Sequence, residues 1–277
     1  MKNFEFIKMH GLGNDFVIID MRTNISKLEN SLIKKISDRK KGIGCDQLIS
    51  IYKSDDGISD CKIKIFNCDG TEAESCGNAI RCVGSELLKE LDKDNLLIET
   101  KAGLVDVEKQ SDGLITVDMG LVKFNWDQIP LSHPQDTQDL MIETRKLKKG
   151  IAVNVGNPHV IFFCEDLVES QLIEDCKKVS KMKIFPMGVN ISMVKVENKN
   201  KINLITYERG CGFTQACGTA ACASVVACNK LNLCEKRTDV LMRGGKLTID
   251  YLSDGHVLMT GPVSKIFEGN YSESDLE

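Results

Sequence analysis

The chain has 277 residues, of which 42% are apolar and 27% charged, and its formal net charge is −4. At roughly 150 residues per domain, this length predicts about two domains, each able to bury a core. The slightly acidic charge and the lack of an apolar run of roughly 18 residues argue against a nucleic-acid partner and a membrane-spanning helix. Two short basic stretches, Arg39-Lys40-Lys41 and Arg145-Lys146-Leu147-Lys148-Lys149, are predicted to lie on solvated surface.

The N-terminus and the cysteines predict a cytoplasmic protein with free thiols. Residues 1–10 alternate Phe4 and Phe6 with polar residues and lack the apolar centre of a signal peptide. Twelve cysteines in a reducing compartment are expected to stay unpaired. Because no two of them form a C-x-x-C pair, a structural zinc site is not predicted. Most are expected to be small buried hydrophobes.

The first half of the chain predicts a strand pair, a helix, two strands, a second helix and a hairpin. Lys62-Ile63-Lys64-Ile65-Phe66 alternates as a half-buried strand does. Ser111-Asp112-Gly113 has the composition of a hairpin turn. After the first strand pair, the predicted elements are a helix over 28–38, strands 46–51 and 62–66, a helix over 79–91, and hairpin strands 104–109 and 114–119.

The second half predicts the same elements in the same order. Its apolar residues again recur at three- and four-residue steps in the helical segments, and Ser253-Asp254-Gly255 forms the predicted hairpin turn. After a first strand pair, the predicted elements are a helix over 168–181, strands 189–196 and 201–206, a helix over 219–231, and hairpin strands 246–251 and 256–260.

Short motifs repeat between the halves at offsets of 141 to 143 residues. Cys76-Gly77-Asn78-Ala79 matches Cys217-Gly218-Thr219-Ala220, and Gly13-Asn14 matches Gly156-Asn157. Several matches in one order predict two equivalent α+β domains, residues 1–120 and 121–263, with the tail 264–277 returning to the first. Two like domains can face each other across a cleft, which is a common location for a binding site.

Cys76 and Cys217 each precede a glycine and a small polar residue at a predicted helix start. The first N–H groups of a helix have no partner within it, and the helix dipole is positive there. A substrate carboxylate can therefore bind at such a start, and the pKa of a cysteine there is lowered from about 8.5.

Two such cysteines in one cleft could invert a carbon centre. One thiolate would remove a proton from one face while one thiol supplied a proton to the other, and fixed dipoles would stabilise the carbanion-like transition state. The alternative is that both cysteines only pack their helices. The duplicated Cys-Gly-(Asn/Thr)-Ala context favours chemistry, because packing does not require a polar flank in both copies.

At these residues the chain resembles the diaminopimelate epimerase family. The resemblance covers nearly the whole chain, because many motifs occur in order. They are Met9-His10-Gly11-Leu12-Gly13-Asn14-Asp15-Phe16, Gly42-Ile43-Gly44-Cys45-Asp46-Gln47, Phe66-Asn67-Cys68-Asp69-Gly70, Cys76-Gly77-Asn78, Gly156-Asn157-Pro158-His159, Gly188-Val189-Asn190, Tyr207-Glu208-Arg209-Gly210, Ala216-Cys217-Gly218-Thr219 and Thr260-Gly261-Pro262.

The resemblance implies conversion of LL-2,6-diaminopimelate to the meso form, without pyridoxal phosphate or metal, in lysine and peptidoglycan-precursor synthesis. It implies that the protein forms a homodimer and that its binding partner is this small-molecule substrate. It also implies two pseudo-symmetric domains, each a mixed or antiparallel barrel-like sheet around central helices, with the active site in the interdomain cleft. Cys76 would take the α-proton from the LL isomer while Cys217 delivers one.

The resemblance also assigns the surrounding residues. His159 and Glu208 would lie beside the thiols and tune their protonation. Amide side chains and one guanidinium suit a second amino-acid head group, since amides both donate and accept and Arg209 pairs with a carboxylate. The substrate-binding residues so implied are Asn14, Gln47, Asn67, Gly77, Asn78, Asn157, Asn190, Glu208, Arg209, Gly218 and Thr219.

Without the resemblance, some of these residues could have a structural role and not a substrate-binding one. Asn14 and Asn157 could be turn residues, and Glu208-Arg209 could be a surface ion pair. The chain departs from the family pattern at Ala79-Ile80, where Gly-Ala is usual, and at Gly212-Phe213-Thr214, where Gly-Glu-Thr is usual. The second departure bears on the contacts of that loop.

Three other functions remain open. A proline racemase or 4-hydroxyproline epimerase also uses paired cysteines but binds one carboxylate, whereas Asn157, Asn190 and Arg209 favour a second head group. The isomerase of phenazine synthesis lacks the cysteine pair. A non-catalytic thiol-rich binding or redox protein would need no such specificity set. A nucleotide is not expected, because neither G-x-G-x-x-G nor a P-loop motif is present.

Overall fold

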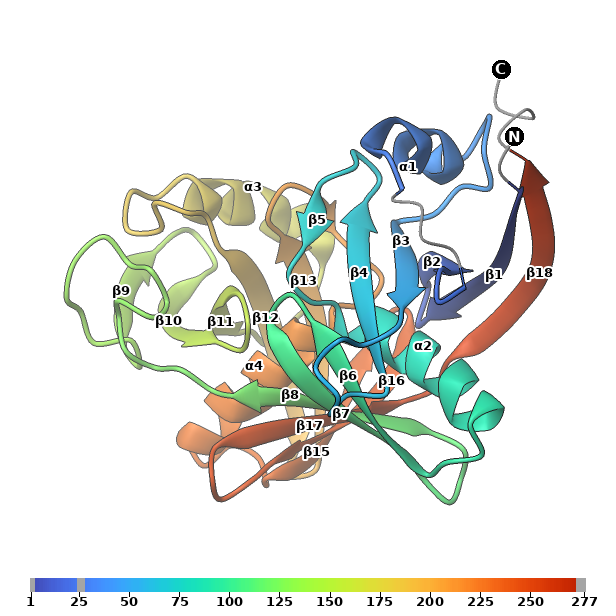
Figure 1. The fold of residues 1–277 in the computed structure, drawn as a ribbon. Coiled ribbons are helices and arrows are strands. Elements are labelled where there is room, and N and C mark those ends of the chain that lie inside the picture. The colour runs from blue at the N-terminus through green and yellow to red at the C-terminus, as the bar shows by residue number, and fades with distance from the viewer. Residues whose placement is uncertain (1–2, 24–27, 273–277) are drawn as a thin grey trace. The chain divides into compact units, whose positions relative to one another are not determined.

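The computed structural model describes residues 3–23 and 28–272, so the ends of the chain, including residues 273–277 of the predicted returning tail, lie outside it. The chain forms two units. Unit 1 holds the residues up to Val117 together with those from Gly261 onward, and unit 2 holds Asp118–Thr260. Both contain the same succession of strands and helices (Figure 1). The predicted α+β fold with two repeated halves is confirmed.

Unit 1 is built on one mixed sheet. Its strands lie in the order β18, β1, β2, β3, β4, β6, β7, β8, with β2/β3 and β4/β6 parallel and the other pairs antiparallel. The short β5 pairs with β4. The strands are β1 (Asn3–Gly11), β2 (Asn14–Asp20), β3 (Gln47–Tyr52), β4 (Cys61–Asn67), β5 (Glu72–Ala73), β6 (Asn95–Thr100), β7 (Gly103–Lys109), β8 (Ile115–Leu121) and β18 (Ser264–Ser272).

The sheet of unit 2 has the equivalent order. It runs β9, β10, β11, β12, β13, β15, β16, β17, with β11/β12 and β13/β15 parallel. The short β14 pairs with β13 as β5 does with β4. The strands are β9 (Leu140–Glu143), β10 (Lys148–Asn154), β11 (Pro158–Phe163), β12 (Asn190–Asn198), β13 (Lys201–Glu208), β14 (Gly212–Phe213), β15 (Arg237–Met242), β16 (Gly245–Tyr251) and β17 (His256–Gly261).

Each sheet curls around one central helix. Helix α2 (Gly77–Glu90) packs on β1 and β2 and also on β6 and β7, strands from distant parts of the sheet. Helix α4 (Gly218–Lys230) likewise contacts β10, β11, β15 and β16. Its sequence is apolar almost all round, as expected for a helix enclosed on every side. Both helices begin and end within two residues of their predicted bounds.

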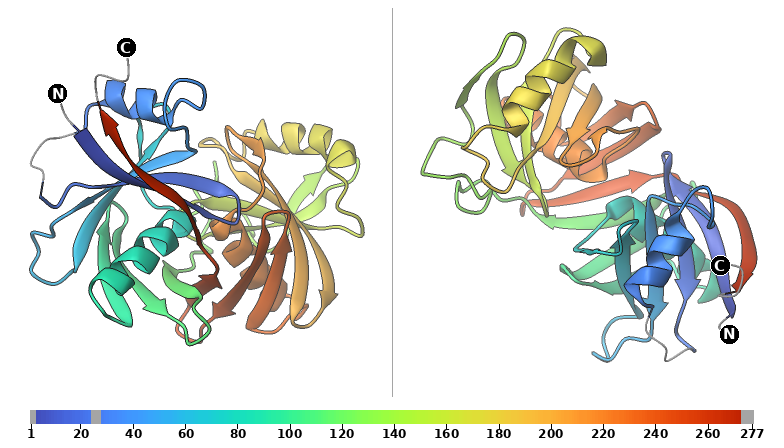
Figure 2. Two further views of the ribbon diagram at one scale, coloured as in Figure 1. Left: turned by 90° about the vertical axis from the view of Figure 1, so that its right-hand side faces the viewer. Right: turned by 90° about the horizontal axis from the view of Figure 1, so that it is seen from above.

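The other two helices lie on the outer faces of the sheets. Helix α1 (Asn30–Ser37) packs on β3, and α3 (Glu169–Ser180) packs on β12 (Figure 2). Val17 and Ile19 of β2 face α1, where they join a core with Ile33 and Ile36. The two predicted helices over 28–38 and 168–181 are confirmed.

Six strands were not predicted, namely β5, β6, β9, β14, β15 and β18. In β6, Leu96 and Ile98 alternate with more exposed residues, but the segment is short and follows a helix without a glycine or proline to separate them. β15 has the same weak pattern. β18 is largely exposed on both faces and has no polar/apolar alternation in its burial, and it forms through backbone pairing with β1 (Figure 2, left). The hairpin strands, by contrast, are where the turns predicted them.

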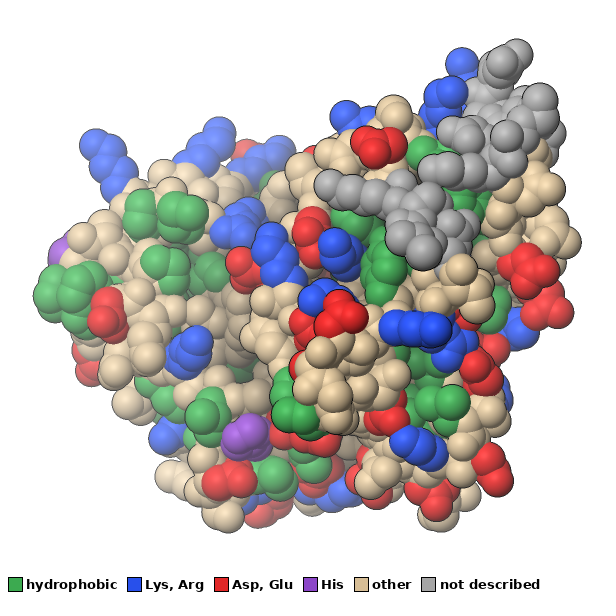
Figure 3. All heavy atoms as spheres, in the orientation of Figure 1, with side chains coloured by type: hydrophobic (Ala, Val, Ile, Leu, Met, Phe, Trp, Pro, Cys, Tyr) green, Lys and Arg blue, Asp and Glu red, His purple; other side chains and the backbone are tan. Residues whose placement is uncertain are grey.

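The surface and the cysteines fit the composition. Basic and acidic side chains are interspersed over the face in Figure 3. Eight of the twelve cysteines are buried, as predicted for most of them, while Cys68 and Cys211 are exposed. Among the described helices, none has the length and apolar character needed to cross a membrane. The described residues also contain no group of three His, Cys, Asp or Glu side chains arranged to hold a metal ion.

Candidate active site

In unit 1, three amide side chains lie at one end of the sheet. Asn14 opens β2, Gln47 opens β3, and Asn67 ends β4. Because β2 and β3 are parallel and β4 is antiparallel to them, the two strand starts and the strand end fall at the same edge. Gln47 pairs directly with Asn67, and its Nε2 donates to Asn67 Oδ1 at 3.0 Å.

Cys76 is the residue that caps the start of α2. It has extended backbone angles, and its carbonyl accepts the first helical hydrogen bond, from Ile80 N at 2.9 Å. Its half-buried thiol donates to Asn14 Oδ1 at 3.7 Å. The same oxygen accepts from Asn78 Nδ2 at 3.4 Å. Cys76, Asn14 and Asn78 therefore form one polar cluster at the helix start.

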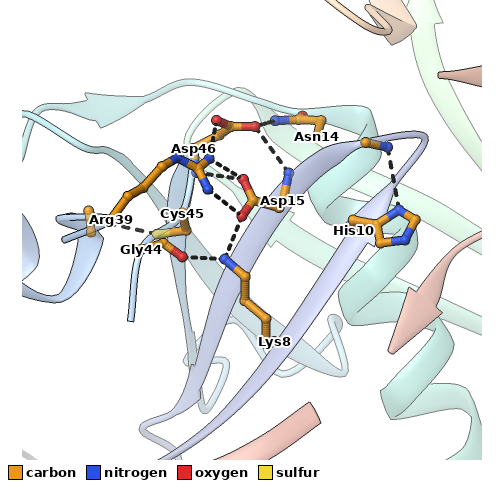
Figure 4. A network of polar contacts seen from close by, with 10 residues as sticks. Lys8, His10, Asn14, Asp15, Arg39, Gly44, Cys45 and Asp46 are labelled. Atoms are coloured by element: carbon orange, nitrogen blue, oxygen red, sulfur yellow. Dashed lines mark hydrogen bonds and ion pairs between the residues drawn. The ribbon is translucent and has the colours of Figure 1, made fainter. Parts of the chain in front are cut away.

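An ion-pair network supports this cluster (Figure 4). Asn14 Nδ2 donates to Asp46 Oδ2 at 3.0 Å, and Arg39 joins Asp46 to Asp15. Burial would raise the pKa of Asp15, but hydrogen bonds from Arg39 and Lys8 lower it well below its usual range. Arg39 lies on the exposed surface, as predicted for its basic stretch, with its side chain 55% exposed, and its guanidinium also pairs with two carboxylates.

Unit 2 places the corresponding residues at the corresponding end of its sheet. Asn190 opens β12, Glu208 ends β13, and Asn157 directly precedes β11. Asn190 Oδ1 accepts the backbone N–H of Arg209 at 2.9 Å. The Arg209 guanidinium donates to the carbonyl of Met187, so it lies over the turn before β12.

Cys217 caps the start of α4 as Cys76 caps α2. Its carbonyl accepts from Ala221 N at 3.0 Å. The residue is only 6% exposed, and its sulfur lies 3.5 Å from Thr219 Oγ1. The expected lowering of the pKa at the helix start is wrong for Cys217, because burial and the negative charge of Glu208 raise the pKa of this thiol well above its ordinary value. Thr214 Oγ1 donates to Glu208 Oε1 at 2.5 Å and holds that carboxylate in place.

His159 is fully buried and connects Asn157 to Thr219. Its Nε2 lies 2.8 Å from Asn157 Oδ1 and 3.0 Å from Thr219 Oγ1. Because the amide oxygen can only accept, Nε2 carries the proton. Burial, and then the charge of Arg209, lower the pKa of His159 to about 3. The imidazole is thus neutral at pH 7 and is linked to Cys217 through the hydroxyl of Thr219.

Each unit therefore combines a helix-start thiol with polar side chains from strand ends. The helix starts of Gly77-Asn78 and Gly218-Thr219 direct backbone N–H groups outward, where a carboxylate can bind. The thiols themselves differ. Cys76 meets an amide oxygen and is half-buried, whereas Cys217 is buried beside a carboxylate.

Sequence reasoning did not assign a role to Asp46, Arg81 or Thr214. Arg81 is fully buried on α2 and donates to Asn78 Oδ1 at 2.9 Å. Asp46 stands inside a motif that was used for the resemblance, and Arg81 follows shortly after another, but neither position carries a sign of its partner. Thr214 follows Phe213, the residue that departs from the family pattern, and its bond to Glu208 shows that this loop still contacts the site.

Comparison with known proteins gives one family. The family model described as diaminopimelate epimerase matches residues 6–125 and 151–266. A diaminopimelate epimerase of Acidiphilium cryptum is 41% identical, with 95% of each chain covered. One from Pelagibacter ubique is 44% identical and covers 94% of this chain and 95% of its own.

Solved structures share the fold at low sequence identity. A Bacillus anthracis protein of the phenazine biosynthesis PhzF family has a TM-score of 0.72 and 15% identity, covering 98% of this chain and 100% of its own. A hydroxyproline epimerase from Agrobacterium vitis has a TM-score of 0.65 and 14% identity, covering 98% and 91%. At this identity the likeness establishes the fold alone.

Proposed function

The chain belongs to the diaminopimelate epimerase family, and on that premise we propose that it epimerises LL-2,6-diaminopimelate to the meso form with Cys76 and Cys217 as its acid–base pair. One observation carries the proposal. Each unit places one cysteine at the start of its central helix, beside polar side chains from neighbouring strand ends. Inversion of a carbon centre needs two such groups, one for each face.

The protonation of the thiols sets the direction of proton transfer. Cys217 rests as a thiol, because burial and Glu208 raise its pKa. It is therefore the group that supplies a proton to the LL isomer. Cys76, as the thiolate, takes the α-proton and becomes a thiol, while Cys217 gives its proton to the opposite face and becomes a thiolate. Exchanging these two states runs the reaction backwards.

The α-carboxylate of the reacting centre binds at the helix starts. N–H groups at Gly77-Asn78 and Gly218-Thr219 donate to it, and both helix dipoles favour negative charge there. As the α-proton leaves, the developing charge spreads towards this carboxylate, where fixed donors stabilise it. Both steps use groups of the chain and require neither pyridoxal phosphate nor a metal.

The distal amino-acid head group binds the amide side chains and Arg209. Gln47 and Asn67 are already joined in unit 1, and Asn190 is joined to the backbone of Arg209 in unit 2. These contacts fix the side chains before substrate arrives. An ammonium group can meet the amide oxygens, and a second carboxylate can meet the Arg209 guanidinium.

We further propose a cytoplasmic homodimer. Twelve cysteines suit a reducing compartment. In unit 1, β18 exposes Ile266 and Phe267, which are 52% and 48% exposed, and a second copy of the chain could cover them. Light scattering of the purified protein measures the mass in solution, and the monomer mass would contradict the dimer.

The activity is tested by separating stereoisomers after incubation of the purified protein without added cofactor. LL-diaminopimelate is expected to give the meso form. L-proline and 4-hydroxyproline are the matched alternatives, since racemases acting on them bind only one carboxylate. Turnover of either of these, without turnover of diaminopimelate, would contradict the proposal.

A further inference from the structure

A directional chain of hydrogen bonds runs past the sulfur of Cys76. Arg81 donates to Asn78 Oδ1 at 2.9 Å, and Asn78 Nδ2 donates to Asn14 Oδ1 at 3.4 Å. Asn14 Nδ2 then donates to Asp46 Oδ2 at 3.0 Å. A guanidinium can only donate and a carboxylate can only accept, so the two ends allow the amides between them one orientation.

We propose that Asp46 and Arg81 are positioning residues that make Asn14 present its amide oxygen, and not its NH₂ group, to the sulfur of Cys76. The inference rests on the proposed function, in which Cys76 is an acid–base group. An amide oxygen accepts the S–H proton and so stabilises the thiol that Cys76 becomes when it takes the α-proton, which makes the thiolate a stronger base; an amide NH₂ would stabilise the thiolate instead and weaken it as a base. The chain therefore controls the protonation of this cysteine.

Asp46 is itself held firmly. Its Oδ1 accepts from Arg39 at 2.7 Å, and its Oδ2 accepts the backbone N–H of Asp15 at 3.1 Å (Figure 4). Asp15 is bound in turn by Lys8, a buried lysine that also donates to the carbonyl of Gly44. A buried ammonium is costly unless it is paired and hydrogen-bonded, and here both conditions are met.

Unit 2 folds in the same way without such a chain. Asn157, the counterpart of Asn14, meets the neutral imidazole of His159. At the same offset of 143 residues, the positions of Asp15 and Asp46 are taken by Pro158 and Val189. Since the fold does not require these carboxylates, their presence in unit 1 points to the local chemistry of Cys76.

A double-mutant cycle between Asp46 and Asn14 tests the proposal. Asp46→Ala removes the acceptor of Asn14 Nδ2, and kcat/KM is expected to fall about tenfold, the effect of one lost orienting hydrogen bond. In an Asn14→Ala background the same substitution is expected to change nothing further. A full tenfold loss in both backgrounds would show a merely structural role and overturn the proposal.

A second readout follows the thiol directly. Iodoacetamide labels the thiolate form of Cys76, and peptide mass spectrometry measures the labelling rate at each pH. The pH midpoint of this rate reports where the thiol ionises. Asp46→Ala frees the Asn14 amide to turn and removes a negative charge, while Arg39, Lys8 and Arg81 remain. The freed amide, the lost negative charge and the remaining cations all favour the thiolate, so the pH midpoint of Cys76 labelling is expected to fall. An unchanged or higher midpoint would contradict the proposal.

Asp60→Ala is the matched control. Like Asp46, Asp60 pairs with a cationic side chain, Lys93, and accepts one backbone N–H, from Leu97 at 2.9 Å. Unlike Asp46, it accepts no hydrogen bond from an amide side chain of the site. It is expected to keep the wild-type kcat/KM and the wild-type labelling midpoint. If the Asp46→Ala protein does not fold, the double-mutant cycle is repeated with Asp46→Asn, for which a loss of kcat/KM is again expected.

Failure of the proposed function can be told apart from failure of this inference. Full turnover by Cys76→Ala would contradict the two-thiol mechanism, whatever the result for Asp46.

Discussion

The two half-sites share a topology and differ in how they treat their thiols. In unit 1 the half-buried Cys76 meets an amide oxygen that ion pairs hold in place. In unit 2 the buried Cys217 stands beside Glu208 and is linked through Thr219 to a neutral His159. The repeat thus supplies two equivalent helix starts, and the side chains around them give each thiol a different environment.

This difference teaches that duplication fixes position but not protonation. Cys217 is kept as a thiol by lost solvation and a nearby charge. At Cys76, the protonation of the thiol is instead influenced by the direction of the hydrogen bond to Asn14. Both surroundings favour the protonated thiol, that of Cys217 through burial and charge and that of Cys76 through an accepting amide oxygen.

The largest expected effect comes from removing either thiol. Cys76→Ala and Cys217→Ala should each lower kcat for diaminopimelate by about a thousandfold or more, because each removes the proton carrier of one face. Cys164→Ala, half-buried like Cys76, and Cys234→Ala, buried like Cys217, serve as controls. A stereoisomer assay measures all four variants. Full turnover by either catalytic-site variant would remove the basis of the comparison.

The neutral His159 predicts a pH-dependent stability at the site of unit 2. Its pKa is about 3 in the folded protein against an ordinary value of 6.5, so the unfolded chain binds this proton first as pH falls. The free energy of unfolding should therefore drop between pH 6.5 and 3, by about 2 kcal/mol from pH 7 to pH 5. Urea titrations should show a shallower dependence for His159→Gln. An unchanged slope, or the same shallowing in the exposed control His133→Gln, would contradict this.

Glu208→Gln sharpens the contrast between the thiols. Loss of the negative charge should lower the pKa of Cys217, so the midpoint of its labelling by iodoacetamide should fall. The midpoint for Cys76 in the same sample is the internal reference. Equal shifts at both cysteines would mean that the protein has opened and that Glu208 does not act on Cys217 in particular.

Gly188→Ala probes how unit 2 positions Arg209. Gly188 has φ +72°, and an added Cβ would lie 2.6 Å from Cδ of Arg209. The displaced guanidinium should raise KM for diaminopimelate by about tenfold or less, with a smaller effect on kcat. Gly113→Ala has a similar φ of +85° but open space around it, and is the control for backbone strain alone. A KM equal to that of the control would show that Arg209 does not depend on this turn.

Much of the fold could be predicted because many of its elements have recognisable sequence patterns that span only a few residues. The alternation of residues 62–66, the hairpin turns at Ser111-Asp112-Gly113 and Ser253-Asp254-Gly255, and the apolar periodicity of the central helices all act over a few residues. β18 could not be predicted in this way, since polar and apolar residues alike are exposed in it and its pairing with β1 spans almost the whole chain.

The site was predictable only where a motif repeats or resembles the family. Cys76 and Cys217 satisfy both conditions. The supporting network does not repeat, because Lys8, Asp15, Arg39 and Asp46 have no counterpart in unit 2; Asp15 and Asp46 do lie inside motifs that resemble the family, but nothing in those motifs shows which side chains they meet. A charged side chain in a loop gives no sequence signal of the carboxylate it will meet after folding, so the exposure of Arg39 could be predicted but its ion pairs could not.

The central claim, that two thiols act on opposite faces of one carbon, is tested most directly by isotope transfer. LL-diaminopimelate is incubated with the protein in deuterated water, and both isomers are analysed early by mass spectrometry. The account predicts solvent deuterium at the inverted α-carbon of the meso product and almost none in the remaining LL substrate, because different groups remove and supply the proton. Deuterium appearing equally in the recovered LL isomer would indicate a single acid–base group and would contradict the account.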